Sequence, residues 1–208
     1  IHGANVVGVE MDEEGRELDG LEHAFRTEPN VKLLYVIPTF QNPSGKTMSL
    51  ARRKAIYELC VKYGVMILED NPYGELRFRG EDIPTFKSMD DEGIVIYNGS
   101  YSKVLSAGMR IGFVMAQKDV LQRLTVAKQF SDCHSNIFFQ IVTDEWLRTA
   151  DVDAHIAKIR KIYRDRCDFM LKLLDEHMDK RVTYTRPDGG LFLWCTLPEG
   201  CDSQELAD

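Results

Sequence analysis

Three polar clusters follow three apolar segments, and together they hold the side chains that could carry out chemistry. They lie at residues 41–45 (Gln-Asn-Pro-Ser-Gly), 69–74 (Glu-Asp-Asn-Pro-Tyr-Gly) and 100–103 (Ser-Tyr-Ser-Lys), and Arg110 follows the last of them. The apolar segment before each cluster is typical of a buried β-strand. In open α/β sheets, ligands bind at the edge formed by the carboxyl ends of the strands. We therefore expect the three clusters to meet at one edge of a sheet.

The side-chain types in these clusters match the needs of pyridoxal phosphate (PLP). This cofactor needs an amine for a Schiff base, and a carboxylate that keeps the pyridine nitrogen protonated so that the ring accepts electrons. Lys103 offers the amine and Asp70 the carboxylate. Hydrogen-bond donors near the phenolic oxygen of the ring lower the proton affinity of the Schiff base, and Asn42 and Tyr73 can be those donors.

The phosphate of PLP needs cationic and hydroxyl groups together with backbone N–H groups. Ser100, Ser102 and Arg110 could supply them. Each residue also has an ordinary interpretation, because a single lysine is usually a surface group and Asn-Pro sequences are usually turns. The PLP interpretation is preferred because all the ordinary ones would have to hold at once, with the order and spacing of the clusters left to coincidence.

The same clusters resemble those of the fold type I PLP-dependent enzymes, aminotransferase class I/II. Within that group the chain is most similar to the aminoadipate and the aromatic or branched-chain transaminases, and also to the aminotransferase-like domain of MocR regulators. Weaker similarity extends over the whole chain, including the Gly-Gly-Leu-Phe-Leu-Trp sequence at residues 189–194. The matching segments are residues 38–45, 69–73, 99–103 and 108–112.

The resemblance implies a role for each residue. Lys103 would be the Schiff-base lysine and the base that moves the substrate proton. Asp70 would pair with the ring nitrogen, and Tyr73 and Asn42 would bind the phenolic oxygen, with Asn42 also near the substrate carboxylate. Three further residues would hold the phosphate: Ser100, Ser102 and Arg110.

The implied function is a PLP-dependent aminotransferase that transfers an amino group between an amino acid and a 2-oxo acid, acting as a cytoplasmic homodimer. Two alternatives remain: a PLP-binding effector domain of a MocR-type transcriptional regulator, and a PLP-dependent lyase on the same scaffold. The family also carries parts that this chain lacks, among them the arginine that binds the substrate α-carboxylate. We therefore expect a fragment of a longer chain, and expect the isolated 208 residues to be a poor catalyst.

The composition excludes several other classes. A net charge of −7 disfavours binding to nucleic acid, and no segment is apolar enough to cross a membrane. The Arg-Arg-Lys sequence at residues 52–54 is interpreted as a solvated helix face. Five scattered cysteines and five histidines without ligand spacing predict reduced thiols and no metal site. Residues 44–47 end like a P-loop, but Phe40 stands where that motif needs glycine.

Alternating strands and helices predict an α/β fold with a mostly parallel sheet, which the resemblance refines to a three-layer PLP-transferase-like large domain. This domain would span residues 1–150, with its N-terminal part missing, and residues 151–208 would form a linking helix and the start of a smaller α+β domain. The strand at 110–116 has no crossover helix before it, which favours an antiparallel arrangement. The expected strands are 5–9, 31–37, 65–68, 94–97 and 110–116; the expected helices are 18–27, 49–63, 118–130, 136–148 and 153–177; a hairpin is expected from 182–185 and 191–196.

Overall fold

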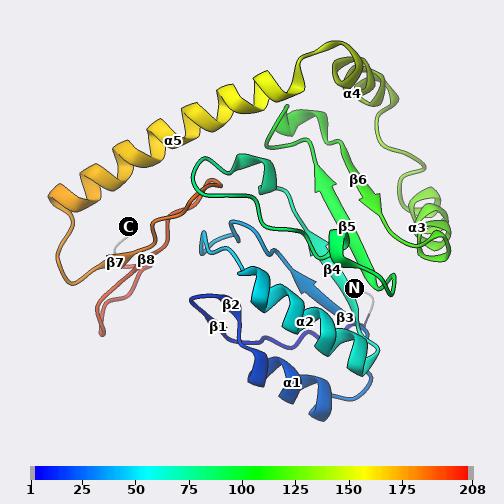
Figure 1. Cartoon of the computed structure of the whole chain (residues 1–208), viewed down its shortest axis with the longest axis horizontal. Helices are drawn as coiled ribbons and strands as arrows, with labels where there is room; N and C mark the ends of the chain where they lie inside the picture. The colour runs from blue at the N-terminus through cyan, green and yellow to red at the C-terminus, as the bar shows by residue number, and fades with distance from the viewer. Residues whose placement is uncertain (1–2, 206–208) are drawn as a thin grey trace.

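A four-stranded sheet organises the computed structural model, which describes residues 3–205 (Figure 1). Its order is β3 (Leu33–Val36), β4 (Met66–Asp70), β5 (Val95–Ser100) and β6 (Gly112–Met115). The first three strands are parallel, and β6 is antiparallel to β5. The strands predicted at 31–37, 65–68, 94–97 and 110–116 are confirmed with somewhat different bounds, and so is the antiparallel direction of the last one. The carboxyl ends of β3, β4 and β5 therefore share one edge.

Two helices cover one face of this sheet, α1 (Leu18–Thr27) and α2 (Leu50–Tyr63). The opposite face of β3 is open among residues 3–205, because Leu33 and Tyr35 are 48% and 47% exposed. The expectation that this strand is buried on both faces is therefore wrong for the described part of the chain. The residues of the core between helices and sheet are Leu21, Leu34, Val36, Met48, Ile56, Cys60, Val65, Ile67, Phe86 and Val95.

Helix α2 begins and ends with local signals that the sequence carries. The Ser49 hydroxyl accepts a hydrogen bond from the backbone N–H of Arg52 at 3.2 Å, which caps the helix. Gly64 ends it with φ of +65°, a left-handed conformation that glycine adopts without strain. One prediction for this helix is wrong: Arg53 does not lie on a solvated face but is fully buried.

The predicted first strand is also wrong. Residues 5–9 form no strand, and Val6 is 89% exposed. A strand needs a neighbour to satisfy its backbone hydrogen bonds, and no described segment pairs with these residues. The chain instead forms a short antiparallel hairpin from β1 (Met11–Asp12) and β2 (Gly15–Arg16).

The second half of the chain is mostly helical, with α3 (Lys118–Ser131), α4 (Ile137–Thr149) and α5 (Val152–His177) close to their predicted bounds. Helix α5 has 26 residues, so it is about 40 Å long at 1.5 Å per residue. Figure 1 shows it running along the top of the molecule from α4 to the predicted hairpin of β7 (Thr183–Tyr184) and β8 (Cys195–Thr196).

Short 3₁₀ helices complete the connections: η1 (Gly74–Leu76), η2 (Lys87–Met89) and η3 (Ala107–Met109). Ile159 and Tyr163 of α5 pack against the small core that includes Leu76 of η1.

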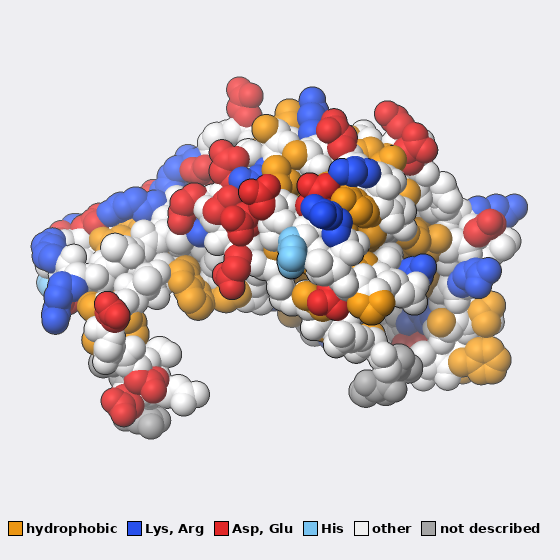
Figure 2. All heavy atoms as spheres, turned by 90° about the horizontal axis from the view of Figure 1, so that it is seen from below, with side chains coloured by type: hydrophobic (Ala, Val, Ile, Leu, Met, Phe, Trp, Pro, Cys, Tyr) orange, Lys and Arg blue, Asp and Glu red, His pale blue; other side chains and the backbone are white. Residues whose placement is uncertain are grey.

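The surface of the described residues has two further properties. Figure 2 shows basic side chains interspersed with acidic ones on the face it displays. None of the helices within residues 3–205 combines the length and apolar character that a bilayer crossing requires.

Candidate functional site

Asp70 ends β4 and lies beside Asn98 of β5 in the parallel register. Its Oδ1 accepts a hydrogen bond from the Asn98 side-chain amide at 2.9 Å, and its Oδ2 accepts one from the Tyr35 hydroxyl of β3 at 2.8 Å. Burial, helped by the bond to Asp70, raises the pKa of Tyr35 to about 12. The Tyr35 phenol therefore keeps its proton at neutral pH and acts as the donor.

Tyr73 and Asn42 form a second contact next to Asp70. Burial raises the pKa of the Tyr73 hydroxyl, the negative charge of Asp70 adds to that rise, and a hydrogen bond with the Asn42 side chain opposes it. Tyr73 is only 5% exposed, and its ring meets that of Phe192 edge-on at 5.4 Å. Of the predicted site residues, Asp70 and Asn42 are thus the two whose electrostatic influence reaches the Tyr73 hydroxyl.

A separate group consists of Ser100, which ends β5, and of Ser102 and Arg110 in the connection that follows. The Ser100 hydroxyl accepts a hydrogen bond from the Ser102 backbone N–H at 3.1 Å, and Arg110 Nη1 lies 3.4 Å from Ser102 Oγ. Arg110 has φ of +56°, a left-handed conformation that is unusual for a residue with a side chain and often marks a functional turn. Arg110 is exposed, and its guanidinium lies beside Ser102.

Lys103 lies in the same turn and is half-buried. The next residue is held from outside the turn, because the His155 Nε2 of α5 lies 2.7 Å from the Val104 carbonyl oxygen. Since a carbonyl can only accept, the His155 Nε2 carries the proton in this contact. Helix α5 therefore fixes the backbone beside the candidate Schiff-base lysine.

Strand β5 joins the two groups of residues. Asn98, which binds Asp70, and Ser100 are two residues apart and therefore point to the same face of the strand. The two positions are separated by roughly 7 Å along it. This separation is similar to the length of one aromatic ring that carries a phosphate group. A single small ligand could therefore reach both Asp70 and the Ser100–Arg110 group.

The donor set fits PLP. The two groups found to bind Asp70 among residues 3–205, Tyr35 and Asn98, are both neutral, so the carboxylate charge remains available for a cationic ring nitrogen. Asn42 and Tyr73 offer donors for a phenolic oxygen. Ser100, Ser102 and Arg110 offer two hydroxyl groups and a guanidinium for a phosphate.

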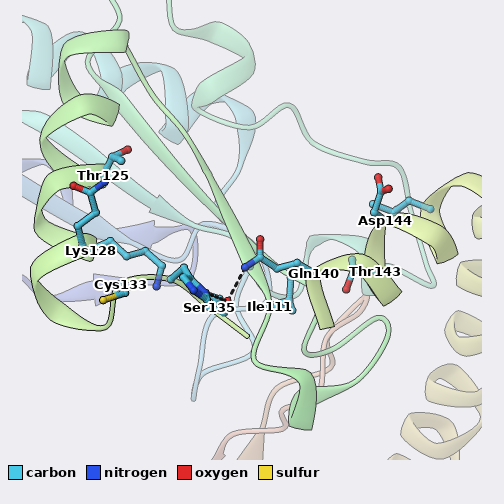
Figure 3. Close-up of a pocket in the computed structure, with 12 residues that line it drawn as sticks. Ile111, Thr125, Lys128, Cys133, Ser135, Gln140, Thr143 and Asp144 are labelled. Atoms are coloured by element: carbon cyan, nitrogen blue, oxygen red, sulfur yellow. Dashed lines mark hydrogen bonds between the residues drawn. The ribbon is translucent and has the colours of Figure 1, made fainter. Parts of the chain in front are cut away.

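A cavity of about 480 Å³ lies between α3 and α4, and Ile111 and Gly112, which directly follow Arg110, also line it (Figure 3). Its wall includes Thr125, Lys128, Gln140 and Asp144, and Gln140 donates a hydrogen bond to the Ser135 carbonyl oxygen at 2.7 Å. None of the seven predicted site residues lines it. This cavity therefore borders the candidate site near Arg110 without containing its predicted residues.

Sequence reasoning did not identify Tyr35, Asn98 or His155 as parts of the site. Tyr35 and Asn98 flank Asp70 because of strand order and register, which join segments far apart in the chain. Their polar character on apolar strands was the available signal. His155 gave no signal, because only the packing of α5 brings it to Val104.

The sequence model described as aminotransferase class I and II matches residues 1–208. An aromatic-amino-acid aminotransferase of Thermococcus litoralis is 44% identical over 206 residues, which cover 97% of this chain and 49% of that protein. An HTH-type transcriptional regulator of Bacillus subtilis is 35% identical over 195 residues, covering 94% of this chain and 40% of that protein.

A crystal structure of the kynurenine aminotransferase of Pyrococcus horikoshii, in complex with PMP and its substrates and products, has a TM-score of 0.92 to this chain. The two are 40% identical, and the similarity covers 96% of this chain and 50% of that one. This likeness confirms the predicted fold class. The chain spans about half the length of the relatives it matches.

Proposed function

We propose, from the premise that the chain belongs to the family of class I and II aminotransferases, that its parent protein is a PLP-dependent aminotransferase acting on an amino acid and a 2-oxo acid. The observation that carries the proposal is the position of Asp70, bound by two neutral donors at the carboxyl edge of the sheet and next to Tyr73. The PMP in the kynurenine aminotransferase of Pyrococcus horikoshii supports the choice of cofactor.

When bound, PLP would supply an electron-accepting ring. Lys103 would hold the cofactor covalently, and its freed amine would take the proton from the substrate Cα and return it at C4′. Asp70 would face the ring nitrogen, and Asn42 and Tyr73 would donate to the phenolic oxygen. Ser100, Ser102 and Arg110 would bind the phosphate, with the guanidinium supplying the countercharge.

The organisation of the parent protein is part of the same proposal. Residues 1–150 would belong to the PLP-binding large domain, and residues 151–208 would contain the linking helix and the start of the small domain. All five cysteines are free, which fits a reducing compartment such as the cytoplasm. A homodimer is proposed from the family resemblance.

One experiment tests the function on the full-length protein. Addition of PLP should produce a visible absorbance band that disappears on borohydride reduction, and Lys103→Ala should abolish the band. Lys158→Ala, which removes an exposed lysine of α5, should leave it intact. A wild-type protein that forms no band with PLP would contradict the proposal.

A second candidate is a PLP-binding effector domain of a regulator, favoured by the similarity to the Bacillus subtilis regulator. Both candidates need the same cofactor residues, so turnover separates them. An aminotransferase should convert an amino acid and a 2-oxo acid into the exchanged pair, whereas an effector domain should bind PLP without turnover. Product analysis with a labelled amino acid would also reveal a lyase, because elimination products would replace the transaminated acid.

A further inference from the structure

Phe40 lies two residues before Asn42 and has an unusual backbone. Its φ is +51°, in the left-handed region that few residues with side chains adopt. Its side chain is 1% exposed. A strained backbone of this kind persists only where the surrounding structure holds it in place. The contacts of the Phe40 ring therefore help to hold the chain that continues to Asn42, together with hydrogen bonds from the Phe40 N–H to Thr47 Oγ1 at 3.1 Å and from the Gln41 N–H to the Lys46 carbonyl oxygen at 2.9 Å.

One of these contacts is with Arg77, which follows Tyr73 by one turn of chain. The Arg77 guanidinium carbon lies 4.8 Å from the centre of the Phe40 ring, and Arg77 is only 7% exposed. A guanidinium above an aromatic face is attractive, and burial strengthens the attraction. The contact links the segment that carries Tyr73 to the loop that carries Asn42.

The other contact is with the backbone of Gly189 and Gly190. A Cβ added to Gly189 would lie 2.3 Å from Phe40 Cζ, and one added to Gly190 would lie 2.5 Å from Phe40 Cβ. Real Cβ atoms do not approach other atoms so closely, so only glycine leaves room for the ring. Gly190 also needs glycine for its φ of +75°.

Backbone hydrogen bonds hold this glycine pair against the segment that follows Tyr73. The Gly190 N–H donates to the Leu76 carbonyl oxygen at 3.1 Å, and the Phe78 N–H donates to the Asp188 carbonyl oxygen at 2.9 Å. Phe192, two residues further on, places its ring on Tyr73. The C-terminal segment thus contacts Phe40 on one side and Tyr73 on the other.

We propose that Phe40, which is enclosed by Arg77 and the Gly189–Gly190 backbone and belongs to the same buried cluster as Tyr73, is a positioning residue that holds the Asn42 segment beside Tyr73. This inference rests on the proposed function, in which these two donors serve the phenolic oxygen of PLP. Donors at that oxygen stabilise its negative charge and so lower the proton affinity of the covalent Lys103–PLP link. Displacement of the Phe40 ring should therefore change a spectroscopic property of the bound cofactor.

The test is a pH titration of the visible absorbance of the full-length protein loaded with PLP. Asn42→Ala should raise the apparent pKa of the Lys103–PLP link by roughly one unit, the scale of one hydrogen bond to a charged group. Phe40→Leu should raise it in the same direction. The double variant should match Asn42→Ala alone, because Phe40 acts through Asn42.

Matched controls separate positioning from stability. Phe86→Leu shortens another fully buried phenylalanine, in the core between sheet and helices, and should lower the melting temperature without moving the titration. Gly190→Ala should shift the titration as Phe40→Leu does. Gly64→Ala should not, although Gly64 also has a positive φ, because a Cβ there meets no atom within 4 Å.

Three outcomes would overturn the inference: an unchanged titration in Phe40→Leu, an additive shift in the double variant, or an equal shift in Phe86→Leu. If Phe40→Leu does not fold, the Arg77→Lys variant is measured instead, because it removes the planar group above the Phe40 ring. An unchanged titration in Arg77→Lys would equally contradict the inference. A wild-type protein without an absorbance band would instead contradict the proposed function itself.

Discussion

Asp70 is held by one donor from each neighbouring strand, and this arrangement sets the chemistry expected of it. Tyr35 and Asn98 orient both carboxylate oxygens without neutralising their charge. A carboxylate held in this way can stabilise a protonated ring nitrogen at a fixed position, with no reorganisation during the reaction.

Replacing Asp70 by Asn should keep the shape of the side chain and remove its charge. We expect kcat of the full-length enzyme to fall by about 10²–10³-fold at saturating PLP, the loss typical of removing one preorganised electrostatic group. Steady-state kinetics would measure the change. Asp91→Asn, at an exposed position, serves as the matched control. Equal kcat values for the two variants would show that the Asp70 charge is not used.

The Tyr35 phenol should titrate at unusually high pH. Its pKa is raised from 10.0 to about 12, so its contribution to stability is fully present below pH 10.0 and is lost as the pH rises through about 12. The difference in tyrosinate absorbance between the 208-residue chain and its Tyr35→Phe variant should therefore appear near pH 12. A difference that appears near pH 10 would mean that Tyr35 is neither desolvated nor bound to Asp70 in solution.

At the scale of elements, the loop that carries Asn42 is attached to α2 through one buried side chain. Arg53 donates to the carbonyl oxygens of Pro38 and Met48 at 3.1 Å each, and to that of Pro84 at 2.9 Å. Burial lowers the pKa of Arg53 to about 10, while the charge of buried Glu69 acts in the opposite direction. Arg53 is therefore charged at neutral pH and joins β3, α2 and the segment before η2.

Arg53→Ala should destabilise the protein by about 3 kcal/mol or more, because it leaves the carbonyl oxygens of Pro38, Met48 and Pro84 without their donor. The neighbouring Lys54→Ala is the matched control, since Lys54 is exposed. Urea unfolding of both variants would measure the difference. Similar midpoints for the two would show that the buried arginine adds nothing to stability.

The segment that leads into β5 contains a second buried charge, Asp90. Its side chain is fully buried and forms an ion pair with Lys87 at 2.8 Å. Burial alone would raise the pKa of Asp90, but the hydrogen bonds from Lys87, Val95 and Ile94 outweigh it and lower the pKa. A lowered pKa stabilises the folded state above the ordinary value of 3.8, and this contribution is lost as the pH falls through the folded-state pKa.

Asp90→Asn should therefore cost about 1.5–3 kcal/mol near neutral pH, the range for hydrogen bonds to charged groups. The difference from wild type should shrink as the pH falls below about 3.8, where the wild-type carboxylate also becomes protonated. Denaturant unfolding at neutral and acidic pH would measure it. A difference that stays constant with pH would mean that shape, rather than charge, accounts for the effect.

At the scale of the whole molecule, the described chain exposes much apolar surface. Phe130 of α3 is 89% exposed, and Phe138 and Ile141 of α4 are 63% and 61% exposed. Strands β3 and β6 are the two edges of the described sheet. Exposed apolar patches and open sheet edges promote association.

We expect the isolated 208-residue chain to self-associate and to transaminate poorly. Light scattering coupled to size-exclusion chromatography would measure association, and replacing Phe130 and Phe138 together by Ser should reduce it. Thr149→Ser, a conservative change at the end of α4, is the control. A monodisperse monomer with full transaminase turnover would contradict both expectations.

The sequence by itself determined the helices, the strands of the sheet and the residue types of the site. These features depend on local signals, such as the Ser49 cap, the Gly64 terminus and the polar clusters that follow apolar strands. Local signals also predicted the antiparallel β6, because too few residues precede it for a crossover helix.

Only the tertiary structure decided which residues surround the site. Tyr35 and Asn98 reach Asp70 through strand order and register, Arg53 is buried although it lies in a charged run, and Gly189 and Gly190 lie against Phe40. Residues 5–9 form no strand although their pattern favours one. Each outcome depends on a partner distant in sequence or on the lack of one among residues 3–205, and local pattern holds no information about that partner.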